Sequence, residues 1–459
     1  MTSADAHAFD RGEILPVRPF ASINEQITAI TLHPPYVRNW WNGILITGAL
    51  TALMVVSIGW LFLRGVGIWG INIPVNWSLA IINYVWWIAI GSAGTLISAL
   101  LLVLQEPWRN SLNRFAEAMT VFAVVCAGIF PIIHLGRPFF FLWLFPYPNV
   151  LGVWPQFRSP LEWDVFAVPV YLIVSVLFWY LGLIPDLASL RDRATARWAQ
   201  VFYGVLALGW RGQATHWTRW RRVYRLIAIL GVPLVVSVHS GVAMLYSVGQ
   251  LPGWHSTIFP PFFIIGAVFN GFAVVAMIAV ALRHAFGLDQ LVTQRHLDIL
   301  GMVLLATGLA VGYCYVMEAF TAWYSGDLYE RQALHDRAVG IYAWSFWGAI
   351  ACNVGSIQIL WLPAARRNPW ILFAVGFITT VGMWLERFML QTSSLYQDFL
   401  PSSYGVYWPT FWEYATLLGS IGLFLFLYLL FVRFLPMISI FEVEEVVEDE
   451  RKQQAQGAS

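Results

Sequence analysis

Residues 258–282 of the chain, IFPPFFIIGAVFNGFAVVAMIAVAL, form a run of 25 positions without one charged side chain. An α-helix rises about 1.5 Å per residue, so about 20 apolar residues cross the ~30 Å hydrocarbon core of a bilayer. The run is long enough to cross, and it therefore predicts a membrane-spanning helix.

Nine other segments meet the same criterion, and all ten together predict an all-α integral membrane protein with about ten transmembrane helices. A further apolar stretch at 198–210 is too short to cross, so we expect an interfacial or re-entrant helix there. The expected spans are 42–63, 77–104, 115–135, 164–184, 223–248, 258–282, 297–323, 336–361, 369–390 and 411–434.

The composition supports a membrane protein and excludes several other classes. Of the 459 residues, 59% are hydrophobic and only 11% are charged, whereas an ordinary soluble domain carries about 25% charged residues. A water-soluble enzyme and a disordered chain are therefore excluded. The net charge of +1 does not indicate a nucleic-acid partner. Cys126, Cys314 and Cys352 lie far apart in apolar runs, and they predict neither a metal site nor a disulfide framework.

The basic residues predict the orientation of the chain. With the N-terminus in the cytoplasm, 20 Lys and Arg residues fall inside and five fall outside, which is a strong positive-inside pattern. Both termini are then cytoplasmic, and segment 1–41 lacks the apolar core of a signal peptide. We expect the arginines at 219–225 to lie at anionic headgroups. We expect the acidic residues at 442–450 to form a solvated tail rather than a docking element.

Spans two to five and six to nine are expected to form two four-helix bundles that run in the same direction, flanked by the first and last spans. Each unit opens its third helix near an aspartate, Asp164 in the first and Asp336 in the second. The expected parts are a cytoplasmic segment 1–41, the first span and outer loop 42–75, a first four-helix unit 76–250, a second unit 251–391, an outer loop and last span 392–435, and a cytoplasmic tail 436–459.

The densest group of ionisable residues falls at the outer ends of the third and fourth spans. The stretch FPIIHLGRP occupies 130–138, and EWD occupies 162–164. Ionisable groups at membrane depth are costly, so each is a candidate for function. The short connection makes the two helices neighbours, and we expect His134 and Asp164 to face one pocket, with Arg137 one turn beyond His134.

This pocket suits the oxidation of a hydroquinone, in which two phenolic protons leave as two electrons depart. The imidazole of His134 can take one proton, because imidazole titrates near neutral pH. The carboxylate of Asp164 can take the other, and Arg137 would hold that carboxylate ionised. Trp163 and the aromatic run at 139–143 could pack a planar ring and its isoprenoid tail.

Each of these residues also has a structural interpretation. Asp164 could be an N-cap or a partner of the helix dipole, and His134 could be a hydrogen-bonded interfacial residue. Arg137 could extend from an external loop to water, and the aromatic run could form only an interfacial belt. Only the presence of all four features together, at the ends of two neighbouring helices, favours a binding site.

A second group of ionisable residues lies in or beside the later spans. His239 falls in span five, Glu318 in span seven, and Glu386 and Arg387 in span nine, while Asp336 stands at an outer helix start. Such groups could relay protons through the bilayer. Equally, Glu386 could simply pair with Arg387, and each of the others could have a structural role.

The sequence offers no matched histidine pairs on facing helices for a b-type haem, and no cysteine set for an iron–sulfur cluster. We therefore expect neither group on this chain. The electrons of a quinol would then pass to a partner protein docked on the outer side.

The FPIIHLGRP and EWD stretches, with about ten spans and an arginine-rich inner loop, resemble those of the NrfD/PsrC-type membrane subunits. The resemblance covers nearly all of the chain and is strongest to the larger quinol-side membrane subunit of bacterial alternative complex III. It implies a quinol:acceptor oxidoreductase subunit without haem in the bacterial cytoplasmic (inner) membrane. A quinol, expected to be menaquinol, would be oxidised near the outer face, with His134 and Asp164 at the matching motif positions.

The resemblance also implies partners and a proton path. The partners are an iron–sulfur subunit on the outer face, a second NrfD-like membrane subunit, cytochrome c-type subunits and membrane lipid. Family members are proposed to move protons through buried charges, and His239, Glu386 and Arg387 stand at positions that match. Shorter relatives lack the first and last spans, which favours the alternative complex III branch.

Two further functions fit parts of the pattern. A secondary transporter would carry Gly- or Pro-broken helices at corresponding positions of its two halves, but Pro131 and Pro233 in the first unit have no clear equivalents in the second. A purely structural membrane anchor for other redox subunits is the third alternative.

Overall fold

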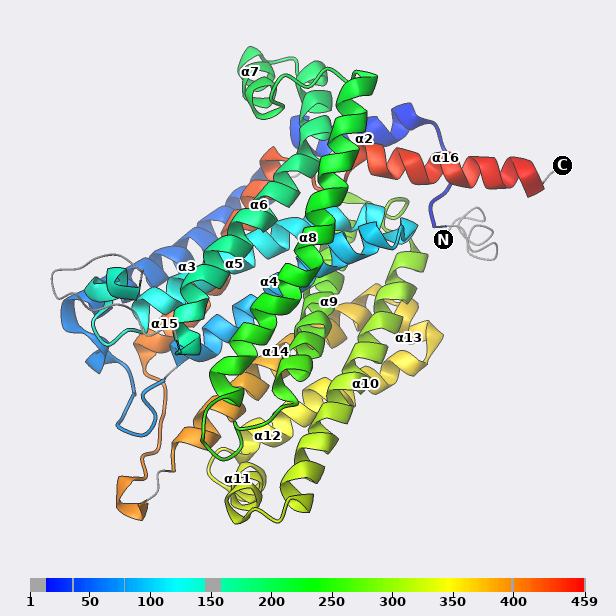
Figure 1. Cartoon of the computed structure of the whole chain (residues 1–459). Coiled ribbons are helices and arrows are strands. Elements are labelled where there is room, and N and C mark those ends of the chain that lie inside the picture. The colour runs from blue at the N-terminus through cyan, green and yellow to red at the C-terminus, as the bar shows by residue number, and fades with distance from the viewer. Residues whose placement is uncertain (1–13, 35–36, 78, 145–157, 398–399, 458–459) are drawn as a thin grey trace.

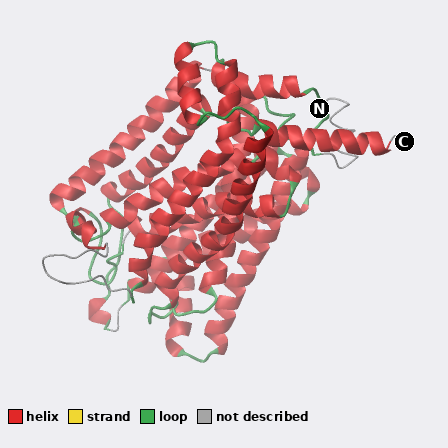
Figure 2. Cartoon of the chain, turned by 45° about the horizontal axis from the view of Figure 1, so that its top comes forward, coloured by secondary structure: helices red, strands yellow, loops and turns green. Residues whose placement is uncertain are grey.

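The computed structural model describes residues 14–34, 37–77, 79–144, 158–397 and 400–457. In these residues the chain folds only into helices, loops and turns, and no strand occurs (Figure 2). Nine described helices are long and apolar enough to cross a membrane. They are α3 (Val37–Arg64), α4 (Leu79–Val103), α5 (Asn113–Ile133), α6 (Pro160–Arg193), α8 (Ala214–Ser247), α9 (Phe259–Phe286), α10 (Gln294–Tyr324), α14 (Pro369–Leu395) and α15 (Phe411–Phe434). The prediction of an all-α integral membrane protein is confirmed.

The expected eighth span at 336–361 is a discontinuous helix. It begins as α12 (Ala343–Ile350), passes through a π-helical turn, Ala351–Gly355, and ends as a 3₁₀ turn, Ser356–Trp361. Its expected start was seven residues too early, because Asp336 belongs to a separate short helix, α11 (Leu328–Val339). That helix is capped at its N-terminus by the Asp327 side chain and ends where Gly340 turns to extended backbone.

Both ends of the described chain lie at the same end of the bundle, as Figure 1 shows. We call this end the terminal face and the other end the opposite face. Three helices cover the terminal face, namely α2 (Phe20–Leu32), α7 (Arg197–Leu206) and α16 (Ile440–Gly457). The apolar stretch predicted to be interfacial or re-entrant is the site of α7.

The acidic C-terminal segment is docked on the bundle, and the prediction of a solvated tail is wrong. Glu442 of α16 is buried and accepts a 2.6 Å hydrogen bond from Arg109. Glu444 accepts from Asn24, and Glu450 accepts from the Ile14 amide. The segment also buries an apolar face that charge counting does not detect, made up of Val443, Val446 and Val447.

Helix α4 forms the centre of the bundle, and small residues allow its close packing. A Cβ atom at Gly94 would lie 2.2 Å from the Ala116 carbonyl oxygen of α5. A Cβ atom at Gly271 of α9 would lie 1.7 Å from the Ala93 side chain. Close backbone approach at small residues is the usual basis of helix association in membranes, so α4 is fixed between α5 and α9.

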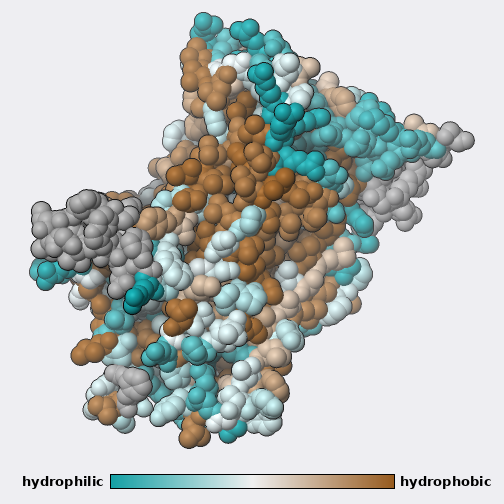
Figure 3. All heavy atoms as spheres, viewed as in Figure 1, coloured by the Kyte–Doolittle hydropathy of each residue, from teal (hydrophilic) through white to brown (hydrophobic). Residues whose placement is uncertain are grey.

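The first and last spans form a pair on the side of the bundle. Helices α3 and α15 pack along each other, with Gly419 and Gly422 of α15 against Met54 and Leu50 of α3. The outward side of α3 exposes large apolar side chains such as Leu45 and Val55. The face of the molecule in Figure 3 likewise carries a broad apolar area between polar ends, which suits a lipid-facing surface.

Candidate functional site

His134 and Asp164 both lie at the opposite face, on helices that pack against each other. His134 follows the end of α5, where its Nδ1 lies 3.1 Å from the Phe130 carbonyl oxygen. Asp164 lies in the second turn of α6, and its side chain is buried. The structure thus brings the two residues to neighbouring helix ends, but the described residues show no direct contact between them.

The structure removes one alternative for Asp164. The N-cap of α6 is Ser159, and the helix begins at Pro160, so Asp164 lies inside the helix and is not its cap. Its carboxylate lies within electrostatic reach of two tyrosines on other helices, Tyr84 of α4 and Tyr246 of α8. Asp164 therefore points into the bundle.

Arg137 and Trp163 contribute less to this pocket than expected. Both side chains are exposed, and within the described part of the chain no ion pair joins Arg137 to Asp164. Phe139 and Phe140 are exposed as well, while the side chain of Trp143 lies outside the described residues. An interfacial belt therefore explains Phe139 and Phe140 as well as a binding role does.

Arg387 of α14 brings a buried positive charge to the interior near the same face. Its guanidinium carbon lies 3.9 Å from the centre of the Phe263 ring, and its Nη1 lies 2.7 Å from Glu386 Oε1. None of its three guanidinium nitrogens makes a well-directed hydrogen bond to a described residue. Glu386 and the Phe263 ring offset the buried charge, and the donors without a directed hydrogen bond remain able to bind water or a ligand.

His239 of α8 lies deeper and is fully buried. Its Nδ1 is 3.2 Å from the Ser92 hydroxyl, and its Nε2 has no hydrogen-bond partner in the described chain. A small cavity beside it, lined also by Ala267 and Ile264, has about 10 Å³ for the centre of a water molecule, which is room for about one.

We call Tyr84, Asp164, His239, Tyr246 and Arg387 the opposite-face cluster. Tyr84 resembles His239 and Arg387, because its buried hydroxyl makes no well-directed hydrogen bond to a described residue, although it lies close to the Asp164 carboxylate. Arg387 lies within electrostatic reach of both His239 and Tyr246. The cluster therefore presents several unfilled donors and acceptors around one buried carboxylate. Sequence reasoning missed both tyrosines, which stand out only as polar tips inside apolar helices.

The other members of the expected proton path form an adjoining network. Glu386 accepts a short hydrogen bond from Tyr315, and Asn353 in the π-helical turn donates to the Tyr315 hydroxyl at 2.8 Å. Glu318 lies within electrostatic reach of Glu386 and pairs with Arg337 at 2.6 Å. The break in the eighth span thus brings an amide into the charged interior, as π-helical turns at functional sites often do.

Asp336 is separate from this network. It lies on α11, where one carboxylate oxygen accepts from Gln332 and the other has no partner in the described chain. The neighbouring Arg337 donates to the Gly253 carbonyl oxygen at 2.6 Å and so ties α11 to the loop before α9. Asp336 therefore lies beside a structural contact of the opposite face.

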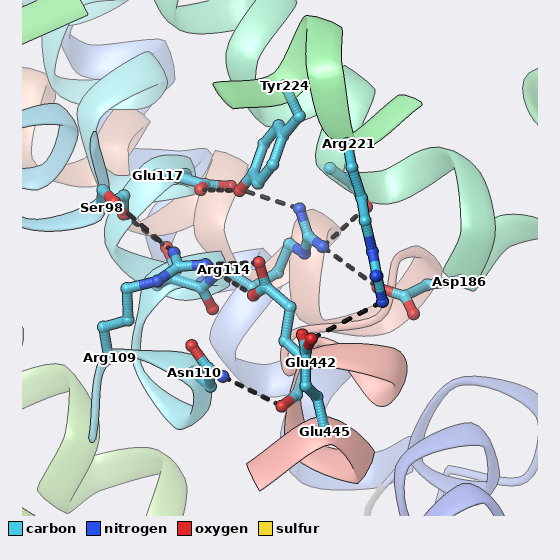
Figure 4. Close-up of polar contacts among 12 residues, drawn as sticks. Ser98, Arg109, Asn110, Arg114, Glu117, Asp186, Arg221, Tyr224, Glu442 and Glu445 are labelled. Carbon is cyan, nitrogen blue, oxygen red and sulfur yellow. Dashed lines mark hydrogen bonds and ion pairs between the residues drawn. The ribbon is translucent and has the colours of Figure 1, made fainter. Parts of the chain in front are cut away.

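A second buried charge network lies near the terminal face, and sequence reasoning missed it (Figure 4). Arg114 of α5 pairs with Asp186 at 3.1 Å and with Glu117 at 3.3 Å. Tyr224 donates to the other oxygen of Glu117 at 3.0 Å. Glu117 and Asp186 could have been found as acids at the ends of apolar runs.

Arg109, which precedes α5, joins the same network through Glu442 of α16. Burial opposes the charged form of Arg109, but the acidic groups around it, Glu442 first among them, together outweigh burial and raise the pKa of Arg109. We call Arg109, Arg114, Glu117, Asp186 and Glu442 the terminal-face network. Here every charged side chain has a charged partner, whereas Asp164 of the opposite-face cluster has no ion pair with a described residue.

Comparison with known proteins agrees with this architecture. The sequence pattern of the family described as "Polysulphide reductase, NrfD" matches residues 69–397, which begins after α3 and ends before α15. The chain is 22% identical over 413 residues to a selenate reductase subunit of Mesobacillus selenatarsenatis, covering 85% of this chain and 93% of the relative. It is 23% identical over 429 residues to the Hdr-like menaquinol oxidoreductase integral membrane subunit of Archaeoglobus fulgidus, covering 88% and 95%. The family match spans well over half of the chain, and the protein therefore belongs to the NrfD family of multi-pass membrane subunits.

Proposed function

We propose that this chain is the quinol-binding membrane subunit of a quinol:acceptor oxidoreductase complex. It would oxidise a quinol, in our proposal menaquinol, at the opposite face and pass the electrons to an iron–sulfur subunit docked there. The observation that carries the proposal is the opposite-face cluster, in which Asp164 is buried among unfilled polar groups. The relative from Archaeoglobus, whose name includes menaquinol oxidoreductase, supports the choice of quinol.

The opposite face is the outer side of the membrane in this proposal, and the terminal face is cytoplasmic. Its support is the arginine distribution, because most basic residues fall at the terminal face. The membrane would be the bacterial inner membrane. An assembly like alternative complex III, with a second NrfD-like subunit and cytochrome c-type subunits, is the arrangement that we propose for the whole complex.

The chemistry needs acceptors for two protons and an exit for two electrons. A quinol supplies both when its two hydroxyls are oxidised. The Asp164 carboxylate would accept one proton at an Oδ atom. The Nδ1 of His134 faces the Phe130 carbonyl oxygen, so this nitrogen carries the hydrogen of the neutral ring and Nε2 is the free base. His134 would accept the second proton there, and both electrons would leave to the partner's iron–sulfur cluster.

Groups with unfilled hydrogen-bonding atoms fit the oxygens of a quinol ring. The Tyr84 hydroxyl and the Arg387 guanidinium are donors, and neither makes a well-directed hydrogen bond in the described chain, although Arg387 is paired with Glu386. Trp163 and Arg137 would lie at the entrance, since both side chains are exposed. These residues would hold and orient the ring while Asp164 and His134 take its protons.

The same interior offers a path for protons into the membrane. We propose that His239 and Glu386 carry protons inward beside the fixed positive charge of Arg387, which stays protonated. Glu318 and Asp336 would serve the opposite-face end of that path. Its support is the unpartnered His239 nitrogen beside a water-sized cavity and the contact chain from Asn353 through Tyr315 to Glu386.

Asp164→Asn in the assembled complex tests the proposed site. We expect quinol oxidation to fall about 100-fold to 10,000-fold, because a positioned proton acceptor contributes about that factor. His134→Ala should also lower the rate, while the exposed Asp192→Asn serves as the matched control. Near-normal turnover of an intact Asp164→Asn complex would remove this residue from the mechanism.

Two further measurements separate the alternatives. A quinone-site inhibitor should bind to the purified chain, and absence of binding would favour a purely structural anchor. In proteoliposomes with a pH-sensitive dye, His239→Ala should lower the number of protons moved per quinol oxidised. If the wild-type protein releases only the two protons of the quinol itself, the proposed path carries no pumped protons.

A further inference from the structure

Helix α7 lies beside the terminal-face ends of α6 and α8, where Figure 1 shows it at the edge of the bundle. One side of this helix is buried: Ala199, Tyr203 and the following Ala207 pack with Leu183, Leu187 and Leu190 of α6. Two hydrogen bonds add to this packing, since Tyr180 donates to the Leu206 carbonyl at 2.6 Å and Arg191 donates to the Trp210 carbonyl at 3.0 Å. The helix is therefore held in one orientation.

The other side of α7 is apolar and uncovered. Its large side chains recur at the three- and four-residue spacing of one helix face. These side chains expose a far larger fraction of their surface than the side chains on the buried side of α7 do. They are Trp198 (64% exposed), Val201 (52%), Phe202 (42%), Val205 (68%) and, just after the helix, Leu208 (69%). We call this set the α7 stripe.

The contacts of α7 with two membrane helices indicate the depth of the α7 stripe relative to the membrane. The Tyr203 hydroxyl donates to the carbonyl oxygen of Phe434, the last residue of the membrane helix α15, at 3.1 Å. Tyr180, which bonds the end of α7, lies inside the apolar part of α6. Helix α7 thus contacts the terminal-face end of α15 and the later part of α6, where we expect the membrane boundary.

The surroundings of α7 are strongly basic. Residues 187–225 contain eight arginines and one acidic residue, Asp192. In the described part of the chain only Arg191 and Arg221 of these arginines lie within 4 Å of a carboxylate. The exposed arginines are Arg193, Arg197, Arg211, Arg219, Arg221, Arg222 and Arg225.

We propose that α7 and the arginines around it form a binding surface for anionic phospholipids. The α7 stripe lies among the acyl chains, and the arginines contact the phosphates of the headgroups. A helix with an apolar face, a tryptophan and a basic border at this depth has the features of an in-plane membrane helix. The excess of positive charge selects anionic lipid over zwitterionic lipid, and this inference does not depend on the quinol site.

The depth of the stripe is testable on the full chain in lipid nanodiscs. A nitroxide label at Val205→Cys, with the three native cysteines replaced by alanine, reports its surroundings. We expect the label to collide more with lipid-soluble oxygen than with a water-soluble nickel complex, and a label at the exposed Gln213→Cys to show the reverse. Equal nickel access at the two positions would place the stripe in water, which favours a protein partner and overturns the proposal.

A second experiment tests the preference for anionic lipid. It keeps the native cysteines, so its result stands even if the labelled protein without them fails to fold. Native mass spectrometry of the chain in equal phosphatidylglycerol and phosphatidylcholine gives the ratio of the two lipids retained. Arg197→Gln should lower that ratio about fivefold, the equilibrium factor for the ~1 kcal/mol of one arginine at an anionic surface. The control is Arg64→Gln at the opposite face. An unchanged ratio for Arg197→Gln and Arg211→Gln would overturn the proposal.

Discussion

The opposite-face cluster and the terminal-face network both bury charge inside one helical bundle, but they differ in how that charge is satisfied. In the terminal-face network, Arg114 and Arg109 each have carboxylate partners within about 3 Å. In the opposite-face cluster, the guanidinium of Arg387 and the hydroxyl of Tyr84 lack well-directed partners in the described chain. Paired buried charges hold a fold together, whereas unfilled ones require a ligand, water or a proton. Under the proposed function, the polar groups of the terminal-face network serve the fold and those of the opposite-face cluster serve the quinol.

The largest effect should come from breaking the terminal-face network at its centre. Arg114→Met leaves Asp186 and Glu117 buried without their cation, which costs about 3–5 kcal/mol of stability. We expect a large drop in the thermal unfolding midpoint of the purified chain. Adding Asp186→Asn and Glu117→Gln should restore much of the loss, and Arg225→Met, on the exposed side of α8, is the control. A single variant as stable as the wild type would show that the pairing is not structural.

A smaller effect is expected where α16 docks. Glu442→Gln weakens the bonds to Arg109 and Asn113, at about 1–3 kcal/mol for hydrogen bonds that involve charged groups. Hydrogen exchange of the α16 amides should therefore become faster. The matched control is Glu445→Gln, whose pair with Arg221 is exposed and 3.6 Å long, and which should change exchange little. Equal exchange in the two variants would contradict the docking role of Glu442.

Two buried tyrosines allow the same comparison to be made by removing a single hydroxyl group from each. Tyr428 donates to the Phe115 carbonyl oxygen at 3.0 Å, so Tyr428→Phe should cost about 1 kcal/mol of stability and leave turnover unchanged. The hydroxyl of Tyr84 makes no such bond in the described chain. Tyr84→Phe should therefore keep the unfolding midpoint and lower quinol oxidation about tenfold, as for one lost hydrogen bond. The reverse pattern would reject the distinction between the two regions.

The smallest effect concerns pH at the opposite face. Burial raises the pKa of Glu330 on α11 above its ordinary value of 4.5, although its bond from the Gly253 amide opposes the shift. The folded chain therefore holds this proton more tightly than the unfolded chain, so its stabilising effect is present below pH 4.5 and is lost as the pH rises through the folded pKa. Exchange of the Gly253 amide in wild type relative to Glu330→Gln should change across this window. A ratio of the two Gly253 exchange rates that stays constant with pH would contradict the raised pKa of Glu330.

Much of the fold follows from the sequence because hydropathy measures what a bilayer requires of each span. Length and apolarity identified the nine long helices, and the arginines predicted both termini on one side. Hydropathy does not register backbone geometry, so the π-helical turn at Asn353 and the separate helix that carries Asp336 were not predicted. The docking of α16 depends on a pair between Arg109 and Glu442, which are 333 residues apart, and a charge count along the chain cannot reveal it.

The candidate site was less accessible to sequence reasoning than the fold. Single ionisable residues at membrane depth identified Asp164, His239 and Arg387, because such groups are rare there. Their neighbours Tyr84 and Tyr246 were not distinguishable from other interfacial aromatic residues, since only packing shows which tyrosines face a carboxylate. Arg137 shows the limit of spacing along the chain, because it lies one turn from His134 but the described structure shows no ion pair between it and Asp164.

The pairing of α3 with α15 has a consequence for biosynthesis. The Ser57 hydroxyl bonds to the Trp412 carbonyl oxygen, 355 residues later in the chain. Protein synthesis proceeds at ~5–20 residues per second, so α3 is in the membrane for tens of seconds before α15 leaves the ribosome. During that interval one flank of α3, including Met54 and Ser57, must be sheltered by lipid or by the insertion machinery. Helix α3 can pack against its partner only when α15 has been synthesised. Truncated products that lack α15 should therefore be recognised by membrane proteases.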